Sequence, residues 1–339
     1  MKKKYKKKVL LIGSKEYFSL EKMYLRAFKK AHCDVNIFHI HNINKNLISR
    51  LIWKYLKFFF FFDERFRLLK YLKKHQNKYD LIIIYKGLYL TDNFLIRLKK
   101  ISPVSKFINI FPDDPFDVRY FKDISNKNIL NAIKYFDYFF IFSKKIKKKL
   151  ELFTLKKNII YLPFAYDPDV HKRSKKSYND MYDLSFIGTA DDDRYNFIKG
   201  LNSYKILVAG NGWSRYKKIK NVTYYGAING KLSSEIIKKS IISLNLLRKQ
   251  NYYSHNMRTF EIPAMGGLML TKKSVEQSFF FKEGQECLMY ENFNDIDNKI
   301  KMVLENKKKF KKIANAGYMV SRKHTYLSRV NSILKIVSG

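Results

Sequence analysis

Two charged side chains in the stretch SHNMRTFEIPAMGGLMLT, at residues 254–271, could bind a small polar ligand. Arg258 and Glu261 are three residues apart, so they share one face of the helix that this stretch predicts. Pro263 would kink the helix, and the glycine pair that follows would end it, because glycine adopts the left-handed conformation of helix ends at little cost. The Glu261 carboxylate could then hold the paired hydroxyls of a sugar. The alternative is a surface ion pair that contributes only about 0.2–0.5 kcal/mol.

Acidic residues are scarce in this chain, yet three of them follow the predicted strand at residues 106–111. Asp113, Asp114 and Asp117 lie in the sequence PDDPFD. The carboxyl ends of the strands form the ligand edge of open α/β sheets, so these aspartates are candidates for a general base or for a clamp on an acceptor hydroxyl. Aspartate before proline is also ordinary turn chemistry, and the sequence leaves both interpretations open.

The elements around these residues repeat a strand, a turn and a helix. Residues 9–39 predict a buried strand, a tight turn at Gly13, a helix and a second strand, an order that is typical of a parallel α/β sheet. A further buried strand, DLIIIY, ends in Lys86 and Gly87. The complete GxGxxG fingerprint of dinucleotide-binding proteins does not occur here, so Gly13 alone is weak evidence for a bound phosphate.

A second cycle of strands and helices begins after a polar, proline-containing stretch at residues 163–180, which we interpret as an interdomain linker. Its first strand, DLSFIG, ends at Gly188 and Thr189. The next strand runs into GNGW at residues 210–213, where glycines would let a ligand approach the backbone and Trp213 could form a flat wall. The chain therefore predicts two successive Rossmann-like halves.

The formal net charge of +39 predicts attraction to phosphates and to anionic lipid headgroups. Lysine supplies 55 of the 68 basic residues, and we interpret part of this excess as the codon bias of an AT-rich genome. The charge is spread along the chain without a nucleic-acid-binding motif, so we expect no nucleic-acid partner. The two cysteines, Cys33 and Cys287, form no metal or disulfide pattern, which is typical of a reducing cytoplasm.

A basic and aromatic segment at residues 51–67 contains five consecutive phenylalanines. Such a segment could lie in a membrane interface, or it could be a helix buried on most sides in a phenylalanine-rich core, which we favour. No apolar run approaches the length of about 18 residues that spans a bilayer. We therefore expect a cytoplasmic protein and keep open a peripheral attachment to the inner face of the membrane.

Several motifs resemble those of the CgeB-like (spore-maturation-type) glycosyltransferases, a group related to the family 4 glycosyltransferases of GT-B fold. The resemblance covers most of the chain. Its most specific part is NMRTFEIPAMGGLMLT. The other matching motifs are LPFAYDP, DLSFIGT, GNGW, LNLLR and HTYLSR in the second half, and KG and DDP in the first.

The resemblance implies the GT-B plan, in which two Rossmann-like domains of α/β class face each other across a cleft. It implies an acceptor domain at residues 1–165 and a nucleotide-sugar-binding domain at residues 178–323. A C-terminal helix at residues 324–339 would pack back on the first domain.

The implied site residues fall into two groups. The donor group consists of Gly188, Thr189, Arg194, Gly210, Gly212, Trp213, Lys249, Asn256, Arg258, Glu261, Gly266 and Gly267. In it Glu261 would bind the nucleotide ribose, and Arg194 with the turn at Gly188 would face the diphosphate. The acceptor group consists of Gly13, Lys86, Gly87 and Asp117, beside the candidate catalytic residues Asp113 and Asp114. The larger family has a second glutamate eight positions before Glu261, where this chain has Tyr253.

These features together predict a glycosyltransferase that moves a sugar from a nucleotide-sugar donor to a surface-glycan, lipid-linked or protein acceptor. The resemblance implies retention of configuration at the sugar and no requirement for a metal ion or other cofactor. The alternative is a non-catalytic protein that binds polyanions or a membrane surface on the same scaffold.

Overall fold

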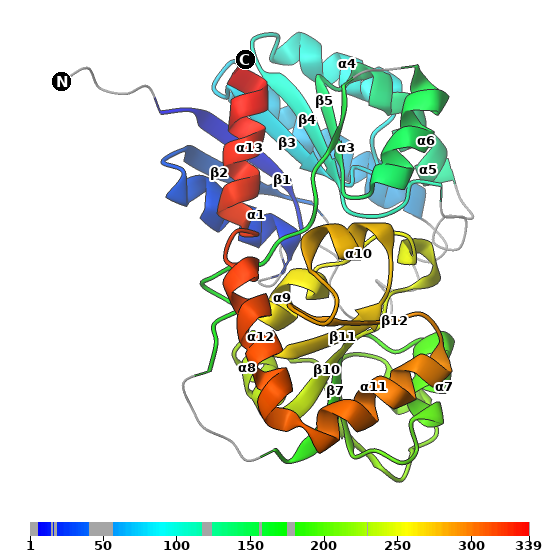
Figure 1. Cartoon of the computed structure of the whole chain (residues 1–339). Helices are drawn as coiled ribbons and strands as arrows, with labels where there is room; N and C mark the ends of the chain where they lie inside the picture. Colours follow the sequence, from blue (N-terminus) through cyan, green and yellow to red (C-terminus); the bar gives the residue numbers. More distant parts are fainter. Residues whose placement is uncertain are drawn as a thin grey trace, which may run out of the picture. The chain divides into compact units, whose positions relative to one another are not determined.

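Two compact units make up the chain in a computed structural model that describes residues 6–14, 16, 19–40, 57–116, 124–155, 158–174, 180–228 and 230–338. The first unit is Met1–Pro163 with Arg329–Gly339, and the second is Phe164–Ser328 (Figure 1). Each unit contains one parallel sheet with helices between successive strands, which confirms the predicted α/β class.

The sheet of the first unit has six parallel strands in the order β2-β1-β3-β4-β5-β6. Strand β3, LIIIY, is buried at every position, as expected for a parallel strand that is covered on both faces. The elements are β1 (Lys8–Gly13), α1 (Leu20–Lys30), β2 (Asp34–His39), α3 (Lys57–Lys74), β3 (Leu81–Tyr85), α4 (Asp92–Ile101), β4 (Lys106–Phe111), α5 (Ile124–Ala132), η1 (Ile133–Tyr135), β5 (Tyr138–Ile141), α6 (Lys144–Thr154), β6 (Ile159–Tyr161) and most of α13 (Tyr326–Ser338).

The sheet of the second unit also has six parallel strands, in the order β12-β11-β10-β7-β8-β9. Its elements are β7 (Tyr182–Ile187), α7 (Asp192–Gly200), β8 (Ile206–Ala209), η2 (Trp213–Arg215), β9 (Val222–Tyr225), α8 (Gly230–Lys238), β10 (Ser240–Asn245), η3 (Lys249–Asn251), α9 (Arg258–Ala264), β11 (Leu268–Lys272), α10 (Val275–Phe280), β12 (Leu288–Tyr290), α11 (Phe293–Glu305) and α12 (Lys307–Ser321).

The strand orders locate the ligand edge of each unit. In the first sheet, β2 lies on one side of β1 and the later strands follow on the other side, beginning with β3. In the second sheet, β8 and β9 lie on one side of β7, and β10, β11 and β12 follow on the other. The order of the strands therefore reverses between β1 and β3 and between β7 and β10. Open α/β sheets bind ligands outside the carboxyl ends of the strands at such switch points. The ligand edges are therefore formed by the loops after Gly13 and Tyr85 in the first unit, and after Ile187 and Asn245 in the second.

The C-terminal helix belongs to the first unit from Arg329 onward. The Tyr138 hydroxyl donates to the carbonyl of Ile336 at 3.4 Å, and Lys7 Nζ donates to Ser338 Oγ at 2.6 Å. Arg329 Nε donates to the carbonyl of Pro163 at 3.0 Å. The end of the chain is thus bound to three separate segments of the first unit.

The aromatic segment divides between the core and the surface. Residues 51–56 lie outside the described part of the chain. On α3, Phe61 is buried whereas Phe62 and Phe66 are exposed, so burial on most sides is wrong for the described part of the segment. No described helix is long and apolar enough to cross a membrane.

The turn after β8 brings two backbone segments into contact. Gly210 has φ +142°, and a Cβ atom there would lie 2.1 Å from the carbonyl oxygen of Gly188. Only glycine fits this position, since both its conformation and the space around it exclude a side chain. The contact fixes the loop after β8 against the loop after β7.

Replacing Gly210 by alanine should therefore lower the free energy of unfolding by about 2–4 kcal/mol, because strained backbone and a backbone clash combine. Chemical denaturation measures the loss. Gly226→Ala is the matched control, since nothing lies within 4 Å of a Cβ there and its φ is not in the left-handed range. Equal stability of the two variants would contradict the packing described.

Candidate functional site

Arg258 and Glu261 form a largely buried pair. The Glu261 side chain is 2% exposed, and its Oε2 accepts from Arg258 Nη1. Arg258 Nε also donates to the carbonyl of Ile187 at 3.1 Å, at the end of β7. The alternative of a surface ion pair is therefore wrong. Arg258 connects α9 to the switch point, and 29% of its side chain is exposed.

His171 is a partner of Glu261 that the sequence did not indicate. The ring is buried, and its Nε2 lies 3.3 Å from Glu261 Oε1. Its Nδ1 accepts a hydrogen bond from the backbone N–H of Asp167 at 3.1 Å. With Nδ1 as the acceptor, the neutral ring carries its proton on Nε2 and donates it to Glu261. Both carboxylate oxygens of Glu261 are thus held by donors.

Burial lowers the pKa of His171 and outweighs the attraction of Glu261, which raises it. The neutral ring is therefore the form that the folded protein favours. The only sequence signal was the segment LPFAYDP, which the resemblance included and which lies just before His171. The segment that we interpreted as a linker thus supplies part of the Glu261 environment.

Asn256 organises the beginning of α9. Its Oδ1 accepts from the backbone N–H of Thr259 at 3.1 Å, and its Nδ2 donates to Asn245 Oδ1 at 2.9 Å. Gln277 Nε2 donates to the Thr259 hydroxyl and to the Thr271 hydroxyl. This network connects α9 to the carboxyl ends of β10 and β11.

A second buried histidine stands beside α9. His255 Nδ1 lies 2.8 Å from Glu276 Oε2, and its Nε2 accepts from the backbone N–H of Phe164 at 3.1 Å. The ring packs edge-on against Phe260 and Phe280. His255 lies inside the stretch at residues 254–271, but nothing in its spacing indicated a partner.

Arg194 joins the two loops of the switch point. It donates to the carbonyl of Thr189 and to the carbonyl of Leu246, both at 2.9 Å, and its guanidinium lies over the Phe186 ring. The residues predicted together, Gly188, Thr189 and Arg194, are therefore brought together. The Arg194 side chain is only 13% exposed, and its guanidinium binds two backbone carbonyls. Its role is therefore to hold the two loops of the site in place.

Three carboxylates lie at the beginning of α7. Asp191 caps the helix by accepting from the Arg194 N–H, and Asp192 and Asp193 fill the first turn. Arg248 Nε lies 3.3 Å from Asp191, and Lys249 Nζ lies 2.7 Å from Asp193. The chain's own acids thus occupy the first turn of α7, and Arg248 and Lys249 pair with two of them.

A hollow of about 410 Å³ lies beyond the ends of β8 and β9. Gly210, Gly212, Trp213, Tyr216 and Tyr225 line it. Trp213 is mostly buried and donates from Nε1 to the carbonyl of Gly188 at 2.9 Å. The indole edge contributes to the wall, while most of the ring packs in the core.

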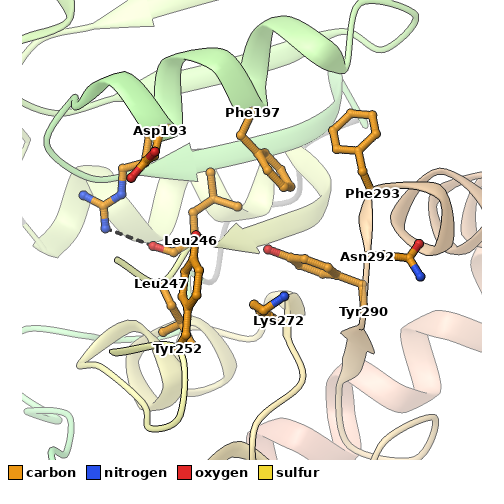
Figure 2. A pocket seen from close by; sticks show the side chains of 10 residues that line it. Asp193, Phe197, Leu246, Leu247, Tyr252, Lys272, Tyr290, Asn292 and Phe293 are labelled. Atoms are coloured by element: carbon orange, nitrogen blue, oxygen red, sulfur yellow. Dashed lines mark hydrogen bonds between the residues drawn. The ribbon is translucent and has the colours of Figure 1, made fainter. Parts of the chain in front are cut away.

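A smaller hollow of about 210 Å³ lies at the ends of β10, β11 and β12. Figure 2 shows Phe197 and Tyr290 turned toward this hollow above Lys272, with Tyr252 on the opposite side. Lys272 Nζ lies 5.4 Å from the centre of the Tyr252 ring. Arg194 and Asp193 also line the hollow. Aromatic walls with nearby charged groups suit a flat or sugar-like polar group.

Gly266 and Gly267 were wrongly grouped with the donor residues. They precede β11 and lie at its amino end, on the edge opposite to the switch point. A Cβ at Gly267 would meet Ile237 and Ile262, and one at Gly266 would meet Arg173. Seven residues of α9, which rise about 10 Å, separate them from the edge where Arg258 lies.

The edge of the first unit brings a lysine and an aspartate together. Lys86 Nζ lies 2.7 Å from Asp113 Oδ2, and both side chains are partly exposed. Lys86 and Gly87 both adopt positive φ, and the carbonyl of Lys86 accepts from Asn109 Nδ2. Asp114 Oδ1 accepts from the Phe116 N–H, which is the turn chemistry that we kept as an alternative.

Gly13 faces a carboxylate. A Cβ there would lie 2.4 Å from Glu21 Cγ, and Glu21 Oε1 accepts from the Ser14 N–H at 3.0 Å. Asp117 lies outside the described residues. Within the described ranges, no group of three or more His, Cys, Asp or Glu side chains could hold a metal ion.

A comparison with protein families matches residues 194–335 to a family described as Glycosyl transferase-like. This region is glycosyltransferase-like. It begins within α7 and ends within α13, so it contains Arg194, Arg248, Lys249 and Arg258 but not β7, the loop that follows it or His171. No curated protein sequence matches the chain.

Solved structures identify the fold of the chain. Anabaena HepE in complex with UDP and glucose is similar at 11% identity and a TM-score of 0.68, over 98% of this chain and 99% of that one. Sucrose-phosphate synthase from Thermosynechococcus elongatus is similar at 11% identity and a TM-score of 0.69, again over 98% of this chain and 99% of that one. The lipopolysaccharide outer core galactosyltransferase WaaB is similar at 14% identity and a TM-score of 0.60, over 97% of this chain and 99% of that one. The predicted GT-B fold is confirmed.

The lowered pKa of His171 has a consequence for stability. Below about pH 6.5 the unfolded chain binds a proton at this ring that the folded chain resists, so the free energy of unfolding should fall on acidification through that range. His171→Gln keeps a donor for Glu261 but removes the titration, so it should flatten this part of the profile. Denaturant unfolding between about pH 5.5 and about pH 7.5 measures the slope.

The control is His32→Asn, at an exposed position with positive φ that asparagine tolerates. It should keep the slope of the unaltered protein. An H171Q profile as steep as that of the control would show that another group carries the dependence.

Proposed function

We propose that this protein is a glycosyltransferase that moves a sugar from a nucleotide-sugar donor to a surface-glycan, lipid-linked or protein acceptor. The observation that carries the proposal is the family match of residues 194–335. HepE, which shares the fold, has been solved with UDP, with UDP and glucose, and with UDP-glucose, and TarM and the pneumococcal O-GlcNAc transferase GtfA with UDP. A uridine diphosphate sugar is accordingly the donor to test first. The likeness to the CgeB-like group remains our prediction.

We propose that the second unit holds the donor at its β7–β10 switch point. The bond from the sugar C1 to the diphosphate breaks during transfer, and negative charge grows on the leaving diphosphate. Arg258, Arg248 and Lys249 would stabilise that charge, because cations fixed before the reaction need little reorganisation. The hollow beside Gly210 and Trp213 would take the nucleoside, and Gly188 with Thr189 would approach the phosphates.

Glu261 would bind the ribose in this proposal. A carboxylate offers about four acceptor positions, of which Arg258 and His171 use two. The ribose hydroxyls would use those that remain, after a small opening of a side chain that is 2% exposed. His171 and Arg258 would hold the carboxylate in one orientation.

We propose that the first unit receives the acceptor beside Lys86 and Asp113. Their ion pair would orient an acceptor hydroxyl, with Asp114 and Gly87 shaping the loops around it. On the resemblance to family 4 enzymes we expect retention at the sugar, with the leaving phosphate taking the hydroxyl proton, and we expect no need for a metal ion. Tyr253, where that family has a glutamate, is largely exposed and would face the sugar differently.

Calorimetry with UDP and UDP-glucose tests the donor site. Arg258→Lys and Glu261→Gln should each weaken binding at least about tenfold, since each leaves a buried charged partner imperfectly satisfied. Arg97→Lys, at an exposed position on α4, is the control and should bind as the unaltered protein does. Transfer activity in the presence of EDTA tests the expectation that no metal ion is needed. The anomeric configuration of the product tests the expectation of retention at the sugar. If no nucleotide sugar binds, or if both variants bind normally, the site assignment is wrong.

A second candidate function, binding to an anionic membrane surface, is favoured by the surface of α6. Its C-terminal turn exposes Leu152 by 72%, and Leu155 just beyond it is 90% exposed. Phe153 is exposed too and packs edge-on against Phe116. Four exposed lysines precede these residues on the helix, Lys144, Lys145, Lys148 and Lys149. Apolar side chains with a lysine collar suit the headgroup region of an anionic bilayer.

Flotation with vesicles that contain anionic lipid tests this surface. The double variant Leu152→Gln/Leu155→Asn should reduce the floated fraction about tenfold or more, because two large apolar side chains no longer enter the interface. Asparagine suits position 155, where φ is +52°. Val275→Gln on α10, also strongly exposed, is the control. Failure of the unaltered protein to float at low salt would rule out the membrane proposal and leave the donor proposal intact.

A further inference from the structure

A second cavity of the glycosyltransferase-like unit lies on the edge opposite to the switch point. It measures about 300 Å³ and is formed where β10 and β11 begin and where α8 ends and α12 begins. Ile241, Leu268 and Phe310 give it an apolar floor. We call it the amino-edge cavity.

The rim of the amino-edge cavity is strongly basic. Lys238, Lys307, Lys308 and Lys311 line it, and Asp180 is its single acidic lining residue. Asp180 lies 3.4 Å from Lys307, so its charge is already shared with that lysine. Three lysines therefore remain around the cavity without a lining carboxylate to balance them.

Lys238 is the least explained of these cations. Its side chain is half-buried, and no carboxylate of the described residues pairs with it. Burial lowers its pKa, and the charges of Arg173 and Lys311 lower it further. An ammonium group in such a place destabilises the free protein, because it loses solvation and gains only repulsion.

The helix that borders the cavity adds to the positive potential. Helix α12 has 15 residues and begins with Lys307, Lys308 and Lys309, with no acidic residue in its first turn. Lysines at a helix N-terminus oppose the helix dipole, which favours anions there. An anion bound in the cavity would interact favourably with the lysines and with the dipole at once.

We propose that the amino-edge cavity binds a phosphate monoester carried on a small apolar body. The phosphate would lie between Lys238, Lys308 and Lys311, and the apolar part would lie on Ile241, Leu268 and Phe310. A cavity of about 300 Å³ has the size of a small organic ligand. The site goes beyond the proposed transfer reaction, since the donor residues lie at the other edge of the sheet. The same chemistry could come from a soluble metabolite or from a lipid headgroup.

Calorimetry with phenyl phosphate tests the proposal on the full-length protein. Lys238→Gln and Lys311→Gln should each weaken the binding of phenyl phosphate at least tenfold. Lys199→Gln on α7, an exposed lysine away from the cavity, should leave it unchanged. Inorganic phosphate should bind more weakly than phenyl phosphate, because it cannot use the apolar floor. The proposal is overturned if phenyl phosphate does not bind, if both cavity variants bind it as well as Lys199→Gln does, or if inorganic phosphate binds equally well.

A thermal unfolding curve shows that the Lys238→Gln variant is folded. Without ligand it should unfold at the same temperature as the unaltered protein or higher, because an unbalanced half-buried charge has been removed. A clearly lower midpoint would show that Lys238 stabilises the free protein and would overturn its assignment to a ligand.

Vesicles that contain phosphatidic acid distinguish the source of the phosphate. Vesicle binding is measured with the Leu152→Gln/Leu155→Asn variant, with and without the further change Lys238→Gln. A tenfold loss of binding caused by Lys238→Gln supports a lipid headgroup as the source. Phenyl phosphate binding without such a vesicle effect supports a soluble phosphate ester. Neither outcome depends on whether UDP-glucose binds, so this site and the donor site can fail separately.

Discussion

Removing the Glu261 carboxylate from water is costly unless charged and hydrogen-bonding partners replace the solvent. Arg258 and His171 provide that replacement, one from the same helix and one from the segment that enters the second unit. Each partner is in turn fixed by backbone, Arg258 by the carbonyl of Ile187 and His171 by the N–H of Asp167. The positions of Arg258, His171 and their backbone partners around α9 thus follow from the need to balance one buried negative charge.

The switch point of the second sheet is stabilised in the same manner. Arg194 holds the loops after β7 and β10 together through two carbonyls, and Gly210 brings the loop after β8 against Gly188. A rigid edge of this kind is what a diphosphate site needs, since its cations must be in position before charge develops. The ion pairs of Arg248 and Lys249 with acids on α7 are partly exposed, so a bound diphosphate could replace these carboxylates as the partner of the two cations.

The strands and their ligand edges could be predicted from the sequence, because runs such as DLIIIY and DLSFIG are mostly apolar and are closed by a glycine at or just after their end. The pairing of Arg258 with Glu261 could be predicted from helical spacing. His171 could not, since its contact with Glu261 depends on how a polar segment folds over α9. Gly266 and Gly267 were misassigned because residues adjacent in sequence were treated as adjacent at the site, whereas α9 carries them to the other edge of the sheet.

The burial of Glu261 also bears on how this chain can change during evolution. A carboxylate that the fold requires, together with its arginine, would be conserved in a descendant that had lost all activity. The Lys249 side chain is 58% exposed and its ion pair with Asp193 lies at the surface, so folding depends on Lys249 much less than on Glu261, and selection for folding alone would let it drift. Among relatives of this chain, the loss of a cation at position 249 should therefore mark the loss of activity earlier than any change at positions 258 or 261.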